Sequence, residues 1–219
     1  MGTEIEKIPP AQIEKRSFEI ITEELKERGI VLPDRQAPII KRCIHTSADF
    51  DYAGNLVFSE KAVEKALLAL RRGAGIVTDT QMAYSGINKK RLAEHGGEVF
   101  CFMADDDVAE RAQQRGTTRA VVSMEKACSL RKELIFAIGN APTALIRLCE
   151  LIKEGKVSPK LIIGVPVGFV NVVQSKEMVL SLDDVPYIVA QGRKGGSNIA
   201  ACICNALLYM IDNERDYWK

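Results

Sequence analysis

The sequence predicts a doubly wound α/β domain, with a mostly parallel sheet of about five strands, helices on both faces and a helical N-terminal arm. Three observations predict this fold: short apolar runs recur along the chain, glycine-rich turns follow them, and segments with helical spacing of apolar residues separate them. Runs that are apolar throughout are typical of strands buried on both faces. Helices between such strands imply parallel pairing through right-handed crossovers. The predicted strands are residues 75–78, 99–103, 134–138, 161–165 and 187–190.

Two helices are predicted to form the N-terminal arm. The first spans residues 11–28 and ends at Gly29, and Ser17 falls on its apolar stripe. The inward face of this helix is predicted to consist of Ile13, Ile20, Ile21 and Leu25. The second helix follows Pro38 and carries His45.

The segments on either side of the strands complete the expected order. Residues 48–55 are predicted to form a loop, after which Ser59 is expected to cap a helix that reaches Arg72. The last helix, residues 198–212, is apolar on nearly all sides. Such a helix must be buried on most sides, either in the centre of the domain or partly against a second subunit.

Composition narrows the class of protein. The chain has 219 residues, 47% of them hydrophobic, which favours one well-buried domain over residues 1–219 with its core in 11–211. The net charge is +1 and no basic run occurs, so nucleic-acid binding has little support. No apolar stretch approaches the roughly 20 residues that span a bilayer, and the charged N-terminus lacks the apolar core of a secretion signal.

Cysteine and acidic residues give no support for a metal or cofactor. The six cysteines are scattered through apolar segments without C-x-x-C spacing, as is typical of reduced core residues in a cytoplasmic protein. The acidic run 105–107 suggests a metal cluster at first sight. Its place at the start of a predicted helix favours a solvated charge run instead. We therefore expect no metal site and no cofactor.

Ligands of doubly wound sheets bind beyond the carboxyl ends of the strands. At those ends this sequence carries glycine and small polar residues, and free N–H groups at helix N-termini favour carboxylates or phosphates. Tight turns alone would also explain the glycines. Asn140 is expected to cap the helix that Pro142 opens. The ligand-binding residues predicted at this edge are Asp79, Met82, Gly86, Asn140, Ala141, Pro142, Thr143, Gly164, Pro166, Val167, Gly168, Phe169, Gly195, Gly196 and Ser197.

Nucleotide and hydrolase signatures are missing from these loops. The sequence has no G-x-x-x-x-G-K-[ST], and residues 192–196 lack the G-x-G-x-x-G spacing of a pyrophosphate turn. It has no G-x-S-x-G nucleophile elbow either. A nucleotide-dependent α/β enzyme is therefore disfavoured.

His45 is the most informative single residue of the sequence. Lys41 and Arg42 lie four and three residues before it on a predicted helix and therefore flank it. Two cations beside an imidazole disfavour its protonated form, which prepares a bound proton for release. The alternative is a hydrogen-bonded structural histidine at a helix end. The other histidine, His95, lies at a predicted helix C-terminus and is interpreted as structural.

Six motifs stand in order along the chain. They are Arg16-Ser17-Phe18, Arg42-x-x-His45, Gly139-Asn140-Ala141-Pro142-Thr143-Ala144-Leu145, Gly164-Val165-Pro166-Val167-Gly168-Phe169-Val170, Ser175-Lys176 and Gly192-Arg193-x-Gly195-Gly196-Ser197. Together they resemble the precorrin-8X methylmutase family of cobalamin biosynthesis, over roughly residues 11–211. Six ordered motifs make this resemblance far more specific than any one of them.

The resemblance implies a homodimer whose active site is shared across the subunit interface. It implies an isomerisation in which a methyl group moves from C-11 to C-12 of a corrinoid ring, giving hydrogenobyrinic or cobyrinic acid. His45 matches the catalytic histidine, and Ser17 and Arg42 match residues that contact the substrate. Residues 46–52 look more like members of the anaerobic branch, which favours cobalt-precorrin-8 as substrate.

Further substrate contacts are expected from the chemistry of the corrinoid. Its rim carries carboxylates, for which Arg42, Arg119 and Lys176 are candidate partners. Arg16 is also predicted to contact the substrate. Met82, Val167 and Phe169 are expected to cover the apolar faces of the ring. The competing class is a corrinoid or tetrapyrrole carrier that binds the same molecule without turnover.

Overall fold

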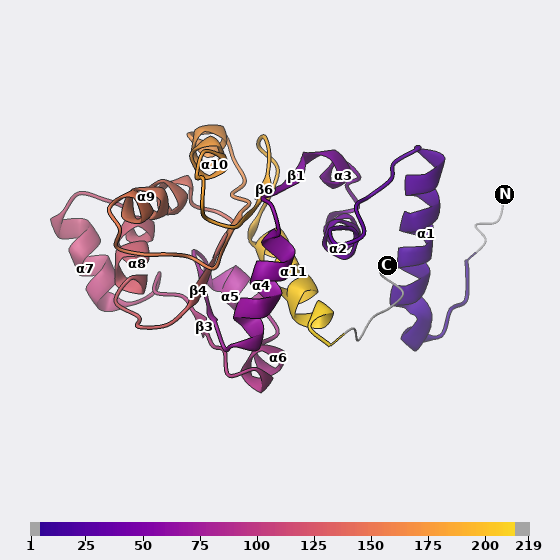
Figure 1. The fold of residues 1–219 in the computed structure, drawn as a ribbon, viewed down its shortest axis with the longest axis horizontal. Helices are drawn as coiled ribbons and strands as arrows, with labels where there is room; N and C mark the ends of the chain where they lie inside the picture. The colour runs from indigo at the N-terminus through magenta and orange to yellow at the C-terminus, as the bar shows by residue number, and fades with distance from the viewer. Residues whose placement is uncertain (1–4, 213–219) are drawn as a thin grey trace.

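A six-stranded sheet runs through the middle of the molecule, with helices on both faces (Figure 1). The computed structural model describes residues 5–212, and its strands follow the order β1-β6-β5-β4-β2-β3. Neighbouring strands are parallel except β1 and β6, which are antiparallel. The strands are β1 (Leu56–Phe58), β2 (Gly75–Thr78), β3 (Val99–Phe100), β4 (Leu134–Ile138), β5 (Leu161–Gly164) and β6 (Tyr187–Ala190).

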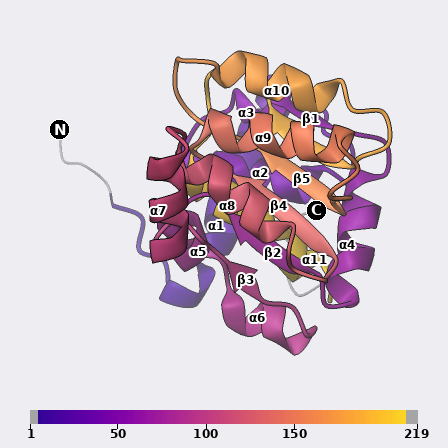
Figure 2. The ribbon, with the colours of Figure 1, turned by 90° about the vertical axis from the view of Figure 1, so that its left-hand side faces the viewer.

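The helices divide between the two faces of the sheet. Helices α8 (Arg119–Ala127), α9 (Pro142–Lys153) and α10 (Val172–Leu180) cover one face, seen from the front in Figure 2. Helices α4 (Ala62–Arg71), α5 (Gln81–Gly86) and α11 (Ser197–Met210) cover the other. Outside α11 lie α2 (Ala37–Ser47) and then α1 (Ile13–Glu27), which a short 3₁₀ turn, Pro10–Gln12, precedes. The remaining helices are α3 (Tyr52–Asn55), α6 (Lys89–Glu94) and α7 (Asp106–Gln114). The prediction of a doubly wound, mostly parallel α/β fold with a helical N-terminal arm is confirmed.

Most predicted strands agree with the structure, and one strand was missed. Residues 75–78, 134–138 and 187–190 form strands as predicted, whereas β5 ends one residue early and β3 ends at Phe100. The missed strand β1 has only three residues and lies at the edge of the sheet, directly after the short helix α3 in the predicted loop. The prediction of Ser59 as a helix cap was wrong: its hydroxyl accepts the Tyr187 N–H at 2.9 Å and extends the β1–β6 pairing. Helix α4 begins at Ala62 instead.

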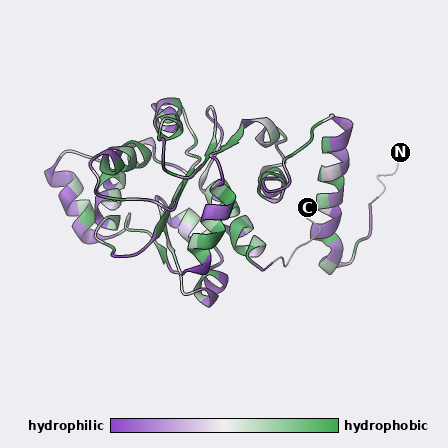
Figure 3. Cartoon of the chain, in the orientation of Figure 1, coloured by the Kyte–Doolittle hydropathy of each residue, from purple (hydrophilic) through white to green (hydrophobic). Residues whose placement is uncertain are grey.

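The predicted inward face of α1 is correct at Ile21 and Leu25 and wrong at Ile13 and Ile20. Phe18, Ile21 and Leu25 are buried, whereas Ile13 and Ile20 are 53% and 43% exposed. The reason is that α1 packs along one side of α2 at the end of the molecule, so only a narrow stripe of it is covered (Figures 1 and 3). The large aromatic side chain of Phe18 fills that stripe, and the two isoleucines face outward.

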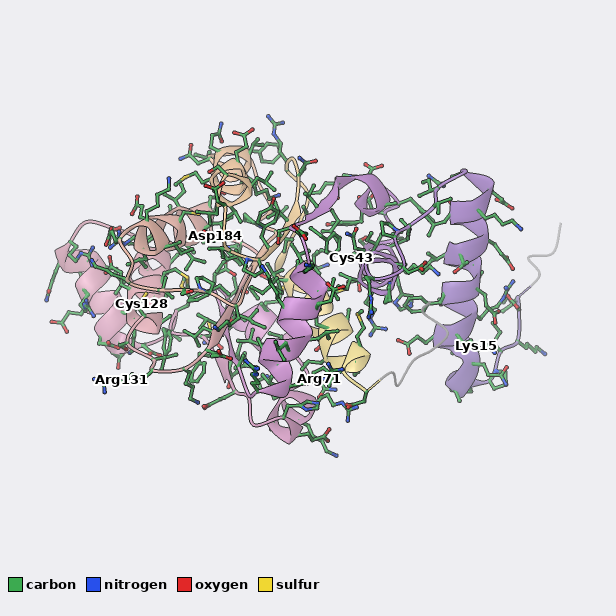
Figure 4. The ribbon with its side chains drawn as sticks, viewed as in Figure 1. Lys15, Cys43, Arg71, Cys128, Arg131 and Asp184 are labelled. Atoms are coloured by element: carbon green, nitrogen blue, oxygen red, sulfur yellow. The ribbon has the colours of Figure 1, made fainter. Side chains whose placement is uncertain are left out.

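Helix α11 is buried within the single chain. It packs against α2, α4 and α5 and against strands β4 and β5, which explains why it is apolar nearly all round. On its α2 side, the Cys202 thiol lies beside the thiol of Cys43, which Figure 4 labels. All six cysteines are free. Of the two explanations for this helix, the central place in the monomer is therefore sufficient.

Residues 5–212 contain neither a membrane-spanning helix nor a cluster of metal-binding side chains. Within residues 5–212, none of the helices combines the length and apolar character needed to cross a membrane. Over the same residues, no group of three His, Cys, Asp or Glu side chains is arranged to hold a metal ion. Asp105 and Asp107 pair with Lys126 at 2.7 and 2.5 Å at the start of α7, where the sequence predicted a charge run.

Candidate active site

The loops that follow the parallel strands meet at one edge of the sheet. The Thr80 and Ser197 hydroxyls, which follow β2 and β6, lie 2.8 Å apart. A Cβ atom on Gly139 would lie 2.7 Å from the Ser197 Cα, and one on Gly195 would lie 2.0 Å from the Val165 carbonyl oxygen. Only glycine fits these two positions, so close packing between loops accounts for both.

Asp79 supports the turn between β4 and α9 from inside the protein. Its side chain is fully buried, and its carboxylate accepts the N–H groups of Gly139, Asn140 and Ala141 at 2.8, 2.8 and 2.6 Å. Burial raises the pKa of Asp79, and these three hydrogen bonds oppose that rise. The prediction that Asn140 caps α9 was wrong. Ala141 is the N-cap residue, and its N–H donates to the carboxylate of Asp79. In this arrangement Asp79 positions the turn and presents no surface to a ligand.

His45 lies in the last turn of α2, next to this edge. Its ring stacks on Phe18 of α1, with centroids 5.2 Å apart and an angle of 23° between the planes, and the residue as a whole is exposed. Partial burial lowers the pKa of His45, Arg42 lowers it further, and Glu14 opposes both. Arg42 therefore acts as predicted. Lys41 does not contribute to this shift; its own side chain is buried and its pKa is lowered by that burial.

Two contacts place His45 beside the sheet edge. The side chain of the next residue, Thr46, lies beside the Cys202 thiol in the second turn of α11. Asp49, one residue past the left-handed cap Ala48, pairs with Lys194 of the loop between β6 and α11 at 2.6 Å. The end of α2 is thus attached to the loop that leads into Ser197.

Arg42, Ser17 and Arg16, the three polar residues predicted near His45, each contact a different partner within the protein. Arg42 pairs with Glu14 and lies over the Tyr209 ring at 5.8 Å, which holds its guanidinium between α1 and α11. The Ser17 hydroxyl donates to the Ile13 carbonyl at 3.0 Å. The Arg16 guanidinium instead contacts Glu6 at 3.1 Å and Glu19 at 3.6 Å.

Lys176 is buried inside the protein and faces the loop that contains Lys194. Its side chain is 1% exposed, and its ammonium donates to the Gly192 and Lys194 carbonyls at 2.8 Å each. Burial lowers the pKa of Lys176 to about 8. The predicted contact of Lys176 with a substrate carboxylate is therefore replaced, in this structure, by contacts with the loop.

Apolar side chains stand exposed around the edge, as the sequence predicted. Met82 is 69% exposed, Phe169 is 79% exposed, and Val167 and Val170 are exposed as well. The Arg193 guanidinium lies 5.2 Å from the centre of the Phe169 ring, which joins the loop after β5 to the loop after β6. Exposed apolar side chains that gather at one place often mark a site where a ligand or partner binds.

The remaining predicted residues differ in their burial and in their place in the fold. Gly164 and Pro166 are buried, and Gly86 lies against Ala201, where an added Cβ would meet the Ala201 Cβ at 2.9 Å. Gly168 has a φ of 137°, Gly196 precedes α11, and Pro142 opens α9 as predicted. Thr143 is hydrogen-bonded to Thr118 at 3.1 Å, next to Arg119. Arg119 is exposed at the start of α8, on the opposite face of the sheet from α2.

Sequence reasoning missed the ion pairs of Lys194 with Asp49 and Asp51. These residues lie about 145 positions apart, so their spacing carried no signal. It also missed the contact of Phe18 with His45, although Phe18 stands in one of the family motifs.

Comparison with known proteins identifies the family. The chain matches the family model described as precorrin-8X methylmutase over residues 12–210. It is 46% identical to the cobalt-precorrin-8 methylmutase of Priestia megaterium, over 96% of this chain and 92% of that protein. It is also 46% identical to the cobalt-precorrin-8 methylmutase of Salmonella typhimurium, over 92% of this chain and 96% of that protein.

A solved structure agrees with these matches. The crystal structure of precorrin-8X methyl mutase from Thermus thermophilus matches with a TM-score of 0.83 and 36% identity, and the match covers 93% of this chain and 98% of that one. Sequence and fold therefore match over nearly the whole length of each protein. On these grounds the chain belongs to the precorrin-8X methylmutase family, a family of isomerases.

Proposed function

We propose that this enzyme moves a methyl group from C-11 to C-12 of a precorrin-8 corrinoid, with His45 as its acid–base catalyst. The product would be hydrogenobyrinic acid or, when the ring carries cobalt, cobyrinic acid. The observation that carries the proposal is the state of His45. It is an exposed imidazole with a lowered pKa, held beside the carboxyl edge of the sheet.

The methyl shift requires one group that can donate a proton to the macrocycle and then take it back. Protonation of the macrocycle makes the ring position that receives the methyl group electron-poor, and the proton leaves again after the shift. The methyl group stays within the molecule, so the step is redox-neutral. An imidazole with its pKa below the usual value of about 6.5 releases a proton readily, and a positioned acid–base group typically contributes roughly 10²- to 10⁴-fold.

The sheet edge supplies surfaces suited to a flat ring with an acidic rim. Met82, Val167 and Phe169 are exposed and apolar, as a cover for the ring faces requires. Helix α11 begins at Ser197 without a cap from any described side chain, and such an N-terminus favours a carboxylate. Arg42 and Ser17 are proposed to contact the substrate from the side of α1 and α2.

The anaerobic, cobalt-containing branch is favoured for the natural substrate. Both relatives reported above at 46% identity are named cobalt-precorrin-8 methylmutases. Residues 46–52 also resemble that branch. The cytoplasmic location rests on the cysteine content alone and stays a prediction.

We further propose a homodimer with a shared active site. Ligand pockets on one protein usually enclose about 300–1,000 Å³, and the corrinoid with its side chains would fill or exceed the space at one sheet edge. His45 and Arg119 lie on opposite faces of the sheet, so one substrate would meet them most simply from two subunits. Ile13 and Ile20 on the outward face of α1 are exposed apolar residues that a second subunit would cover.

Turnover with an excess of cobalt-precorrin-8 tests the proposal. Methyl migration extends the conjugation of the ring, so the visible spectrum of the whole substrate pool should change. A carrier would change the spectrum only up to one equivalent per site. A purely stoichiometric change would therefore contradict the proposed catalysis and favour the carrier.

A further inference from the structure

Two lysines hold the glycine-rich loop between β6 and α11 from opposite sides. Lys176 reaches it from α10 and donates to the Gly192 and Lys194 carbonyls. Lys194, within the loop, pairs through its ammonium with Asp49 and Asp51, which directly follow α2. The loop is therefore connected both to α10 and to the helix that carries His45.

The loop itself has little stiffness of its own. Gly192, Gly195 and Gly196 all have positive φ values, which glycine adopts without strain and other residues rarely do. Two backbone hydrogen bonds attach it to the loop after β5: Gly196 N–H donates to the Val165 carbonyl at 2.9 Å, and Gly168 N–H donates to the Arg193 carbonyl at 3.3 Å. Holding a glycine-rich segment in one conformation costs much conformational entropy, so contacts with other parts of the protein must offset this cost.

The contacts of Lys176 with the loop require the burial of its charged ammonium, which costs free energy. Its ammonium is buried, and among the described residues no carboxylate offsets the burial that lowers its pKa to about 8. Both of these hydrogen bonds go to carbonyls of the loop, so the ammonium binds the backbone of the loop. Burying a charge costs free energy unless hydrogen bonds compensate it, and here the two loop carbonyls provide that compensation.

We propose that Lys176 and Lys194 are positioning residues that fix the loop 192–196 against helix α10 and against the end of α2. The loop leads directly into Ser197 and the N-terminus of α11, which packs on α2. Its conformation therefore sets how the N-terminal end of α11 lies relative to His45. The importance of this geometry for turnover rests on the proposed function, whereas the fixing of the loop does not.

Amide hydrogen exchange in the protein without ligand tests the proposal directly. In Lys176→Met and in Lys194→Met, we expect the amides of Gly196 and Gly168 to exchange at least about tenfold faster, because the hydrogen bonds they make would open more often. Lys194→Arg keeps the charge and should restore most of the protection. Lys126→Met is the matched control, since Lys126 also pairs with two aspartates but does so at the start of α7.

Unchanged exchange at Gly196 and Gly168 in both methionine variants would overturn the proposal. If corrinoid affinity then fell in Lys176→Met, Lys176 would be a direct substrate ligand instead. If Lys176→Met does not fold, Lys194→Met decides alone, because Lys194 is exposed and its replacement leaves no buried cavity. Faster exchange in a protein that turns over no corrinoid would support the positioning role and contradict the proposed function.

A kinetic measurement separates positioning from a general loss of structure. We expect KM for the corrinoid to rise by a larger factor than kcat falls in Lys194→Met, with both values returning toward the parent in Lys194→Arg. Equal losses in Lys194→Met and Lys194→Arg would count against positioning through the Asp49 and Asp51 ion pairs.

Discussion

The ring of Phe18 stacks on the ring of His45 at a centroid distance of 5.2 Å, and this contact joins α1 to the end of α2. It covers one face of the imidazole, while His45 as a residue stays exposed. It also explains why partial burial is the largest cause of the lowered pKa of His45. The histidine is thus oriented by an aromatic neighbour that the sequence pattern had not placed on the inward side of α1.

Replacement of His45 by alanine should abolish methyl migration while the protein still folds and binds the corrinoid. The imidazole lies at the surface end of α2, so its loss removes little core packing. The expected loss in kcat is roughly 10²-fold or more, the usual contribution of a positioned acid–base group. Spectroscopic turnover and product titration would measure the two quantities.

His95→Ala is the control for this variant. His95 is the C-cap residue of α6, and its Nε2 lies 3.6 Å from an Asp212 carboxylate oxygen, so it has a structural setting. Its activity should remain close to the parent value. Turnover by His45→Ala within threefold of the parent would remove His45 from the mechanism.

The charges around His45 should move its pKa in opposite directions. Arg42 lowers the pKa of His45, so Arg42→Met should raise it toward the ordinary value of about 6.5. Glu14 raises it, so Glu14→Gln should lower it further. An NMR titration of the imidazole protons would measure both shifts, with His95→Ala used to assign the two histidine signals. Shifts of the same sign in the two variants would contradict this account of the site.

The pattern of apolar runs predicted the sheet well, because buried parallel strands carry the signal within themselves. Strand β1 escaped prediction because it has three residues, and its partner β6 lies 130 positions away in the chain. The inward face of α1 was assigned from helical spacing alone, and the structure shows Phe18 where that assignment had Ile13 and Ile20. A helix packed on one neighbour buries a narrow stripe, and spacing does not say which of two adjacent stripes is buried.

The site was predicted in part. The motifs identified the loops and His45, because glycine positions and a histidine that follows two cations by three and four residues are visible in the sequence. The roles of Asp79 and Lys176 were not visible, because both depend on backbone groups that the fold brings from other loops. A charged side chain in a motif was therefore interpreted as a substrate contact, whereas the structure gives it a backbone partner.

The buried ammonium of Lys176 should make stability depend on pH in the alkaline range. Its pKa is about 8 in the folded protein and 10.5 in the reference state. Between these values the unfolded chain binds more protons than the folded one, so the free energy of unfolding should rise with pH. The rise should be complete above pH 10.5 and should be lost as pH falls through 8. Its full size is roughly 3 kcal/mol, from the usual conversion of a pKa shift.

Urea unfolding at several pH values, in the parent and in Lys176→Met, would isolate this contribution. Other lysines and tyrosines titrate in the same range in both proteins, so only the difference between the two proteins reports on Lys176. The same pH dependence in both proteins would show that the ammonium of Lys176 is not buried in solution.

The last prediction concerns assembly: the protein should be a homodimer of about twice 24.2 kDa, in which each site takes groups from both subunits. Light scattering would give the mass. A charge on the outward face of α1, as in Ile20→Glu, should weaken the dimer, whereas Leu68→Glu, at an exposed apolar position on α4, should not.

Mixing two inactive variants tests the sharing of the site itself. If His45 and Arg119 of one site belong to different subunits, a heterodimer of His45→Ala and Arg119→Ala contains one intact site. Random exchange of equal amounts should then restore about a quarter of the parent activity, because half of the dimers are mixed and each has one intact site of two. No recovery from fully exchanged subunits would place both groups in the same subunit, and a monomer that stays fully active at catalytic dilution would exclude a shared site altogether.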